Sequence, residues 1–271
     1  MVHAFPLLVT KAGIWILCVV SWWATPATGT AAGRGILVHQ RDRVRGGDHW
    51  RLLTDRGTVH VWRPSGHEPR TSGAVVYVHG HGSSADHSWK RARLASQFEQ
   101  SGRNALFVVP DAPARQGERI RWPSIDRLLE TVAARTGLRR PTGAVVVVAH
   151  SSGFRTAASW ILDDQVHEII LLDGFHGGRD RFDAWLRRRP DNRLTLVAAR
   201  SSVLADAWLR RLPRIEVRRR ARVPIADDLT TEELSASVLY LRSQFGHERM
   251  VRCGQVLPLL LNQTRLGPSL W

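Results

Sequence analysis

Residues 145–153, Val-Val-Val-Val-Ala-His-Ser-Ser-Gly, join an apolar run to a turn that holds a serine between small residues. Four consecutive valines are typical of a strand that is buried on both faces, as in the centre of a parallel sheet. Ala149 and Gly153 stand two residues on either side of Ser151. Small residues there permit a sharp strand-to-helix turn, which lifts the central side chain above the strand ends. We therefore predict that Ser151 is a nucleophile; the alternative is a serine that only caps a helix.

The sequence around this turn alternates short β-branched runs with longer amphipathic segments. This pattern predicts an α/β domain with a mostly parallel central sheet and helices on both faces. The predicted strands span residues 74–78, 105–109, 144–149, 168–172 and 194–198, with a hairpin over 51–62 and an outer strand within 214–223. The predicted helices span residues 89–99, 124–135, 152–162, 180–188, 203–211, 232–240 and 248–261. We expect Pro258 to kink or split the last helix.

The first 32 residues have the pattern of a targeting segment. A weakly basic start precedes an apolar run from Ala12 to Ala24, and small residues follow it. The run fits a signal peptide and is short for a membrane span. We expect residues 1–32 to be a signal peptide and a short tail, residues 33–271 to form the folded domain, and the protein to be secreted or periplasmic. An uncleaved N-terminal anchor is the alternative.

Amino-acid composition excludes some classes of protein and indicates which partners the surface could bind. With 43% hydrophobic and 23% charged residues among 271, a disordered or fibrous chain is excluded. The formal net charge of +15 comes almost entirely from arginine, with runs at 187–189 and 218–220. Such a surface can bind an acidic envelope polymer, or it can reflect an arginine-rich coding bias. No zinc spacing or RNA-binding aromatic signature is present, so we expect no specific nucleic-acid partner.

Three segments of the chain together resemble the α/β-hydrolase superfamily of esterases, lipases and related acyl hydrolases. They are His79-Gly80-His81-Gly82 after a strand, the turn at Ser151, and a late His247 before the final helix. The resemblance covers residues 50–262 in element order and does not single out one substrate family. It implies the chain order nucleophile, acid, histidine. His247 is therefore favoured as the base, with His176 as the alternative.

The sequence identifies the acid of the triad less clearly than the base. The strand over residues 194–198, where most members of the superfamily would have it, is not followed directly by a carboxylate. Asp173 ends the preceding strand and could reach the same edge of the histidine, as in some lipases. We favour Asp173 and keep Asp206 and Asp227 as alternatives. A structural Asp173 that bonds loop amides is the other interpretation.

The resemblance also implies an oxyanion hole. Its donors would be the backbone N–H of Ser152 and one from His81 or Gly82. The alternative for this segment is a metal site formed by His79, His81 and His87. We expect no metal at the site.

The function that follows is a serine hydrolase that cleaves an ester or an amide without a cofactor. Phe175, His176 and Trp122 are expected to shape the substrate pocket, because ligands bind at the carboxyl ends of strands in open α/β sheets. The substrate would be a small or polymeric acyl compound. Two alternatives remain: a peptidase or amidase with the same triad, and a non-catalytic protein that holds an acidic envelope polymer on the same fold.

Overall fold

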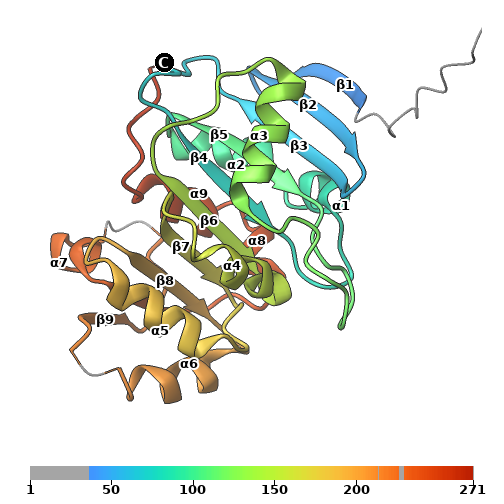
Figure 1. Ribbon diagram of the computed structural model, residues 1–271. Coiled ribbons are helices and arrows are strands. Elements are labelled where there is room, and N and C mark those ends of the chain that lie inside the picture. The colour runs from blue at the N-terminus through green and yellow to red at the C-terminus, as the bar shows by residue number, and fades with distance from the viewer. Residues whose placement is uncertain (1–36, 213, 226–228, 271) are drawn as a thin grey trace, which may run out of the picture. The chain divides into compact units, whose positions relative to one another are not determined.

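Within the residues that the computed structural model describes, 37–212, 214–225 and 229–270, ten strands form one mixed sheet (Figure 1). The strand order is β1-β2-β3-β5-β4-β6-β7-β8-β10-β9. The strands are β1 (Leu37–Val44), β2 (Gly47–Thr54), β3 (Gly57–Arg63), β4 (Gly73–Val78), β5 (Ala105–Pro110), β6 (Val145–His150), β7 (Val166–Leu172), β8 (Arg193–Ala198), β9 (Val217–Arg220) and β10 (Val238–Arg242). The helices are α1 (Ala85–Arg91), α2 (Leu94–Ser101), α3 (Ile125–Thr136), α4 (Phe154–Trp160), α5 (Arg179–Arg188), α6 (Ser202–Leu209), α7 (Thr231–Ser235), α8 (Arg249–Arg252) and α9 (Val256–Asn262).

The sheet is parallel from β5 to β9 and antiparallel at its other edge. Each neighbouring pair in the series β5-β4-β6-β7-β8-β10-β9 is parallel. The strands β1, β2 and β3 pair antiparallel with one another, and β3 pairs antiparallel with β5. The predicted α/β fold with a mostly parallel central sheet is therefore confirmed.

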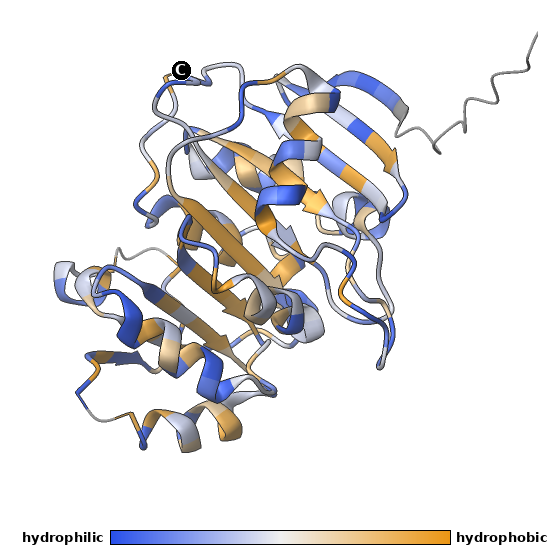
Figure 2. Ribbon diagram, in the orientation of Figure 1, coloured by the Kyte–Doolittle hydropathy of each residue, from blue (hydrophilic) through white to orange (hydrophobic). Residues whose placement is uncertain are grey.

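The valine run of β6 explains why helices cover both faces of the sheet. Val145, Val147 and Ala149 belong to one hydrophobic core, together with residues of α3, α4, α5 and α6. Val146 and Val148 belong to a second core, which includes residues of α1, α2, α8 and α9. Alternate side chains of a strand point to opposite faces, so a strand that is apolar throughout requires a helical layer on each side. Figure 2 shows this hydrophobic character concentrated on the central strands.

Register places the ends of the central strands together. In the ladder between β6 and β7, His150 pairs with Leu172. Ser151 and Asp173 are therefore the next residues of two neighbouring strands. On the other side of β6, Val78 at the end of β4 pairs with Ala149, so the loop after β4 reaches the same edge.

Residues 89–99, predicted as one helix, form two. The helix α1 begins earlier, at a cap where the Ser84 hydroxyl accepts a hydrogen bond from the amide of His87. The helix then ends before Arg93, whose φ of 49° lies in the left-handed region, and α2 follows. A left-handed residue interrupts the helical ladder, so two separate helices, both with residues in the second core, replace the single one.

The prediction of a helix over residues 232–240 is wrong in its second half. A capping box between Thr230 and Glu233 starts α7, which ends at Ser235. The chain then forms β10, which is buried through Leu241 and pairs with β8 on one side and β9 on the other. Burial between two strands outweighs the local helical signal here.

The last helix is split, but not at Pro258. The break between α8 and α9 falls at Gly254, whose φ is 72°. Pro258 is the third residue of α9, where a backbone N–H would have no partner within the helix in any case. The strand β1 was not predicted, and the outer strand predicted within 214–223 is β9.

The predicted signal peptide and tail at residues 1–32 lie outside the described residues, and their assignment stays a prediction. In the part of the chain that the structure describes, no helix has the length and apolar character needed to cross a membrane.

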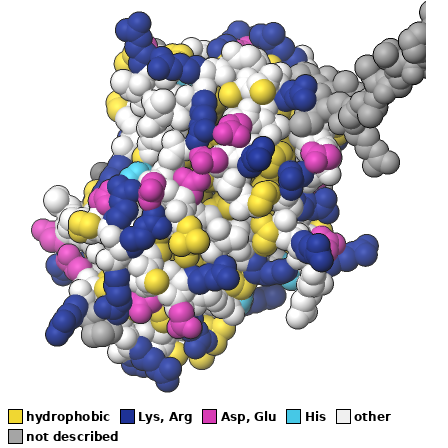
Figure 3. Space-filling model, in the orientation of Figure 1, with side chains coloured by type: hydrophobic (Ala, Val, Ile, Leu, Met, Phe, Trp, Pro, Cys, Tyr) yellow, Lys and Arg dark blue, Asp and Glu magenta, His cyan; other side chains and the backbone are white. Residues whose placement is uncertain are grey.

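Basic side chains are distributed among acidic ones on the face seen in Figure 3. Both arginine runs that stand out in the sequence are ion-paired. The pairs are Arg187 with Asp183, Arg188 with Asp164, Arg189 with Asp191, Arg218 with Glu216, Arg219 with Asp206, and Arg220 with Glu233. The two runs are thus partly neutralised by their own neighbours.

Buried histidines should make the fold sensitive to mild acid. Burial lowers the pKa of His60, His67 and His150 to about 4. In the unfolded chain, histidine binds a proton near pH 6.5. The unfolded state then holds more protons between these values, so the free energy of unfolding should fall as the pH falls from 6.5 toward 4. Urea unfolding at about pH 7 and about pH 5 measures this difference in the free energy of unfolding. His67→Gln, which cannot titrate, should reduce the difference; equal stability of the unmodified chain at both pH values would contradict the prediction.

Candidate active site

Ser151 occupies a strained turn at the carboxyl end of β6. It begins a single 3-10 turn, Ser151–Gly153, that leads directly into α4. Its φ of 54° lies in the left-handed region, which residues other than glycine rarely adopt. Such a conformation costs about 1–3 kcal/mol and persists only where surrounding structure holds it. The strand-to-helix turn expected from the sequence is thus present.

Glycines allow the backbone to pack closely around this turn. A Cβ atom added to Gly80 would lie 2.7 Å from the Cβ of Ser151. One added to Gly153 would lie 2.7 Å from the carbonyl oxygen of Val78, and one added to Gly174 would lie 2.9 Å from the carbonyl oxygen of Ser151. Glycine is therefore required at three places where the ends of β4, β6 and β7 meet.

Asp173 follows β7 and is completely buried. Its Oδ1 accepts hydrogen bonds from the amides of Ala199 and Ser201, at 2.9 and 2.8 Å, and from the Ser201 hydroxyl at 2.9 Å. Its Oδ2 accepts from Nδ1 of His247 at 2.6 Å. Burial alone would raise the pKa of Asp173, but these hydrogen bonds, His247 first, outweigh it and hold the pKa well below its usual range. The carboxylate therefore stays ionised.

His247 lies in the loop between β10 and α8. The amide of Ser243 donates to the carbonyl of Ala198 at 2.8 Å and ties the start of this loop to β8. Nε2 of His150 donates to the carbonyl oxygen of His247 at 3.1 Å, and the two rings lie 4.6 Å apart. Burial, followed by the charge of His247, lowers the pKa of His150 to about 4, so His150 is neutral near pH 7. Together with Asp173, these contacts fix the position of the His247 ring.

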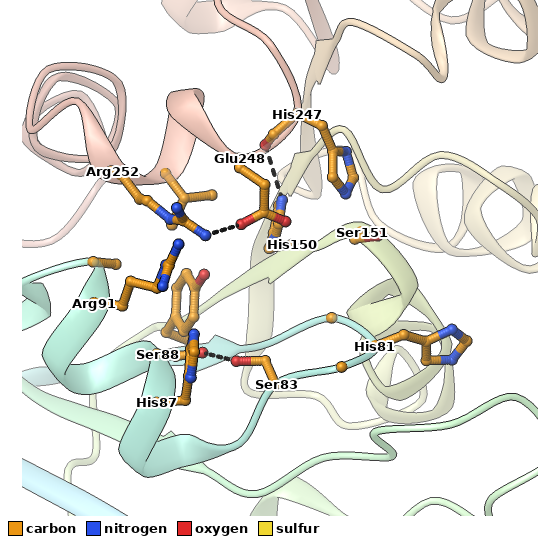
Figure 4. A pocket seen from close by; sticks show the side chains of 15 residues that line it. His81, Ser83, His87, Ser88, Arg91, His150, Ser151, His247, Glu248 and Arg252 are labelled. Atoms are coloured by element: carbon orange, nitrogen blue, oxygen red, sulfur yellow. Dashed lines mark hydrogen bonds and ion pairs between the residues drawn. The ribbon is translucent and has the colours of Figure 1, made fainter.

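Ser151 and His247 line the same pocket, which has a volume of about 340 Å³. Figure 4 shows the imidazole of His247 over Ser151 in this view. Because Nδ1 of His247 donates to Asp173, its Nε2 is the nitrogen left to exchange a proton with a group in the pocket. The arrangement combines a hydroxyl, an imidazole and a buried carboxylate, the groups required for nucleophilic acyl transfer.

The amides expected to bind an oxyanion are not equally free. The amide of Ser152 belongs to the first turn after β6, where backbone N–H groups have no partner inside the helix. The amide of Gly82 donates to the carbonyl of Ala114 at 2.9 Å and is therefore already occupied. Of the two loop residues named from the sequence, His81 is the better candidate, since Gly82 is used to fix the loop.

The alternative residues for base and acid lie elsewhere. Nε2 of His176 donates to the backbone carbonyl of Asp173 at 2.9 Å, and its ring is outside the Ser151 pocket. Asp206 accepts a hydrogen bond from Arg219 at 3.1 Å. Asp227 lies outside the described residues. Among the described candidates, the structure thus brings together Ser151, His247 and Asp173.

Two aromatic residues expected in the substrate pocket belong to the protein interior instead. Phe175 and Trp122 are 1% and 2% exposed and lie in the hydrophobic core on the α3–α6 side of the sheet. Neither lines the pocket that holds Ser151, and His176 does not line it either. The loop after β4, whose His81 and Gly82 were expected near Ser151, forms one wall. The helices α1 and α8 form the others, and the sequence did not indicate them.

The three histidines considered as metal ligands are not assembled around one point. His79 is buried, its Nδ1 donates to the carbonyl of Gly80, and its Nε2 accepts from the amide of Ala112, both at 2.9 Å. Both ring nitrogens are therefore occupied. Elsewhere in the described chain, one group of three side chains brings its metal-ligand atoms within 4.8 Å of one another: His150, His247 and Glu248.

Comparison with known proteins agrees with this fold. A model of the alpha/beta hydrolase family matches residues 75–262, more than half of the chain. The chain belongs to this family. A feruloyl esterase module from Clostridium thermocellum is similar to this α/β-hydrolase, with 11% identity, a TM-score of 0.54, and coverage of 81% of this chain and 89% of that one. An S-formylglutathione hydrolase from Agrobacterium tumefaciens gives 10% identity, a TM-score of 0.51, and coverage of 86% and 100%. A search of curated protein sequences found no match.

Several residues of the site in this α/β-hydrolase were missed by sequence reasoning. Gly174 directly follows the favoured acid, but its close packing against the backbone of Ser151 depends on the register between β6 and β7. His150 lies inside the quoted motif, but its contact with the carbonyl of His247 depends on the late loop of the chain. Arg91 and Arg252 line the pocket from two distant helices, so no local pattern identifies them.

Gly153→Ala tests the close packing around Ser151. The new methyl would lie 2.7 Å from one backbone carbonyl oxygen and 3.0 Å from the next, so the chain must shift. We expect a loss of about 1–3 kcal/mol in the free energy of unfolding, measured by urea denaturation. Gly267→Ala is the control, because nothing lies within 4 Å of the added Cβ. Equal stability of the two variants would show that the turn tolerates a side chain.

Proposed function

We propose that this α/β-hydrolase cleaves carboxylic esters by acyl transfer to water. Ser151 is the nucleophile, His247 the general base, and Asp173 the carboxylate that orients it. The observation that supports the proposal most directly is the 2.6 Å hydrogen bond from Nδ1 of His247 to buried Asp173, made by a ring that shares a pocket with strained Ser151. That bond fixes the tautomer in which Nε2 can accept a proton.

In the proposed reaction, Nε2 of His247 takes the hydroxyl proton as the Ser151 oxygen attacks the ester carbonyl. The amides of Ser152 and His81 donate to the oxyanion of the tetrahedral intermediate. The intermediate collapses when protonated His247 donates its proton to the departing alcohol, which leaves an acyl-enzyme. Water, deprotonated by the same ring, then releases the acid and regenerates Ser151.

Two other functions are weighed against ester hydrolysis. An amidase or peptidase would use the same groups. The two solved neighbours named above are called an esterase and a hydrolase, which fits acyl transfer. Their identity to this chain is too low to distinguish an ester substrate from an amide substrate. A non-catalytic protein that binds an acidic polymer is less well supported, because both arginine runs are ion-paired within the chain. A panel of nitrophenyl esters and aminoacyl anilides distinguishes an esterase from an amidase or peptidase.

Ser151→Ala tests the nucleophile. The purified protein should be labelled by a fluorophosphonate probe and should hydrolyse short nitrophenyl esters. The substitution should abolish labelling and lower kcat by at least about 10³-fold, because it removes the hydroxyl that attacks the ester carbonyl. Ser159→Ala on α4, whose hydroxyl donates to the carbonyl of Thr156, is the matched control and should retain both. Labelling that persists in the Ser151 variant would overturn the assignment.

Asp173→Asn tests the acid. The side chain keeps its size, but its NH₂ group would face N–H groups that now donate hydrogen bonds to the carboxylate. The tautomer of His247 would then no longer be fixed. We expect kcat to fall by about 10⁴-fold with the fold retained in circular dichroism. Asp206→Asn is the comparison, because Asp206 pairs with Arg219 instead and should remain active. A larger loss in the second variant would assign the acid to Asp206.

A further inference from the structure

Two arginine side chains from different helices line the pocket that holds Ser151. Arg91 is the last residue of α1, and Arg252 is the last residue of α8. Figure 4 shows the two side chains reaching toward one region between these helices, across the pocket from Ser151 in this view. Helix C-termini favour cations, which explains a basic residue at each position but not the meeting of both in one pocket.

The charges in this region do not balance. Arg252 donates to Glu248 at 2.5 Å, the carboxylate among the lining residues. Arg91 has no ion pair with any of the described carboxylates and is exposed to the pocket. Two guanidinium groups against one carboxylate leave a formal charge of +1. Like charges that converge repel one another, and an anion placed between them relieves that repulsion.

The remaining walls suit a polar ligand better than a long hydrocarbon chain. Hydroxyl and imidazole side chains, among them Ser88 and His87, line much of the pocket, while Ala92 and Val251 supply small apolar surfaces. A pocket for a fatty acyl group would be lined mainly by apolar side chains. Planar guanidinium groups instead match the geometry of a carboxylate, which they bind through two parallel N–H donors.

We propose that the substrate ester carries a carboxylate group, and that Arg91 and Arg252 bind this group while Ser151 attacks the ester carbonyl. The inference rests on the proposed function and narrows it to one substrate class, anionic esters. Glu248 opposes this binding, because its charge cancels part of the attraction of Arg252 for a carboxylate.

The test compares anionic and neutral esters of matched size. On the acyl side, 4-nitrophenyl hydrogen glutarate is compared with 4-nitrophenyl pentanoate. On the alcohol side, 4-acetoxybenzoate is compared with phenyl acetate. The ratio of kcat/KM within each pair is the quantity measured, and it should favour the anionic member in at least one pair. Comparing the ratio between variants removes differences in the intrinsic reactivity of the esters.

Two substitutions should lower this ratio of kcat/KM values, and a third should raise it. Arg91→Gln and Arg252→Gln should each lower it about tenfold or more, mainly through KM, because each removes a charge-assisted hydrogen bond. Glu248→Gln should raise it. Lys90→Gln is the matched control: Lys90 precedes Arg91 in α1 but lines a different pocket, so the same change of charge should leave the ratio unchanged.

The outcomes separate the two proposals. If neutral esters are hydrolysed and Ser151 is labelled, but no anionic ester is preferred or the arginine variants affect both members of a pair equally, the carboxylate site is refuted and the hydrolase stands. A ratio that also falls in the Lys90 variant would assign the preference to general surface charge and refute the site. Absence of both labelling and hydrolysis would refute the proposed function itself.

Discussion

The close approach of three backbone segments at Ser151 is the constraint on which the site depends. A left-handed serine is unfavourable by itself, and it persists because the ends of β4, β6 and β7 pack against it without side chains between them. These strands are neighbours in the sheet. The same packing that holds the hydroxyl above the sheet therefore also brings the loop after β4 and the carboxylate after β7 to its two sides.

A buried charge at Asp173 is stable only because donors surround it. An isolated carboxylate in the interior would take up a proton, whereas this one accepts hydrogen bonds from two amides, a hydroxyl and an imidazole. Three of these donors come from the loop after β8, and the fourth comes from the loop after β10. The strand β10, which was predicted as part of a helix, carries the chain to His247.

The parts of the molecule that could be predicted from sequence are those with local requirements. The turn at Ser151 needs small residues at fixed spacing, and buried strands need continuous apolar runs, so both are visible in the chain. The choice of His247 and Asp173 needed the chain order of a resembling family, because twelve histidines give no local distinction. Arg91 and Arg252 line one pocket only after folding brings their helices together. Buried aromatic residues such as Trp122 cannot be distinguished from pocket walls by their proximity to a strand end.

Among the described residues, both edge strands of the sheet carry charged side chains. At one edge β1 contains Arg41, Asp42 and Arg43, and at the other β9 contains Arg218 to Arg220. An edge strand exposes unpaired N–H and C=O groups that another chain can extend. Side chains opposite each other across a new strand pair would lie about 5 Å apart, so a second copy docking β9 against β9 would oppose arginine to arginine. The fold therefore discourages its own growth into larger sheets, at the edge where the strand is shortest.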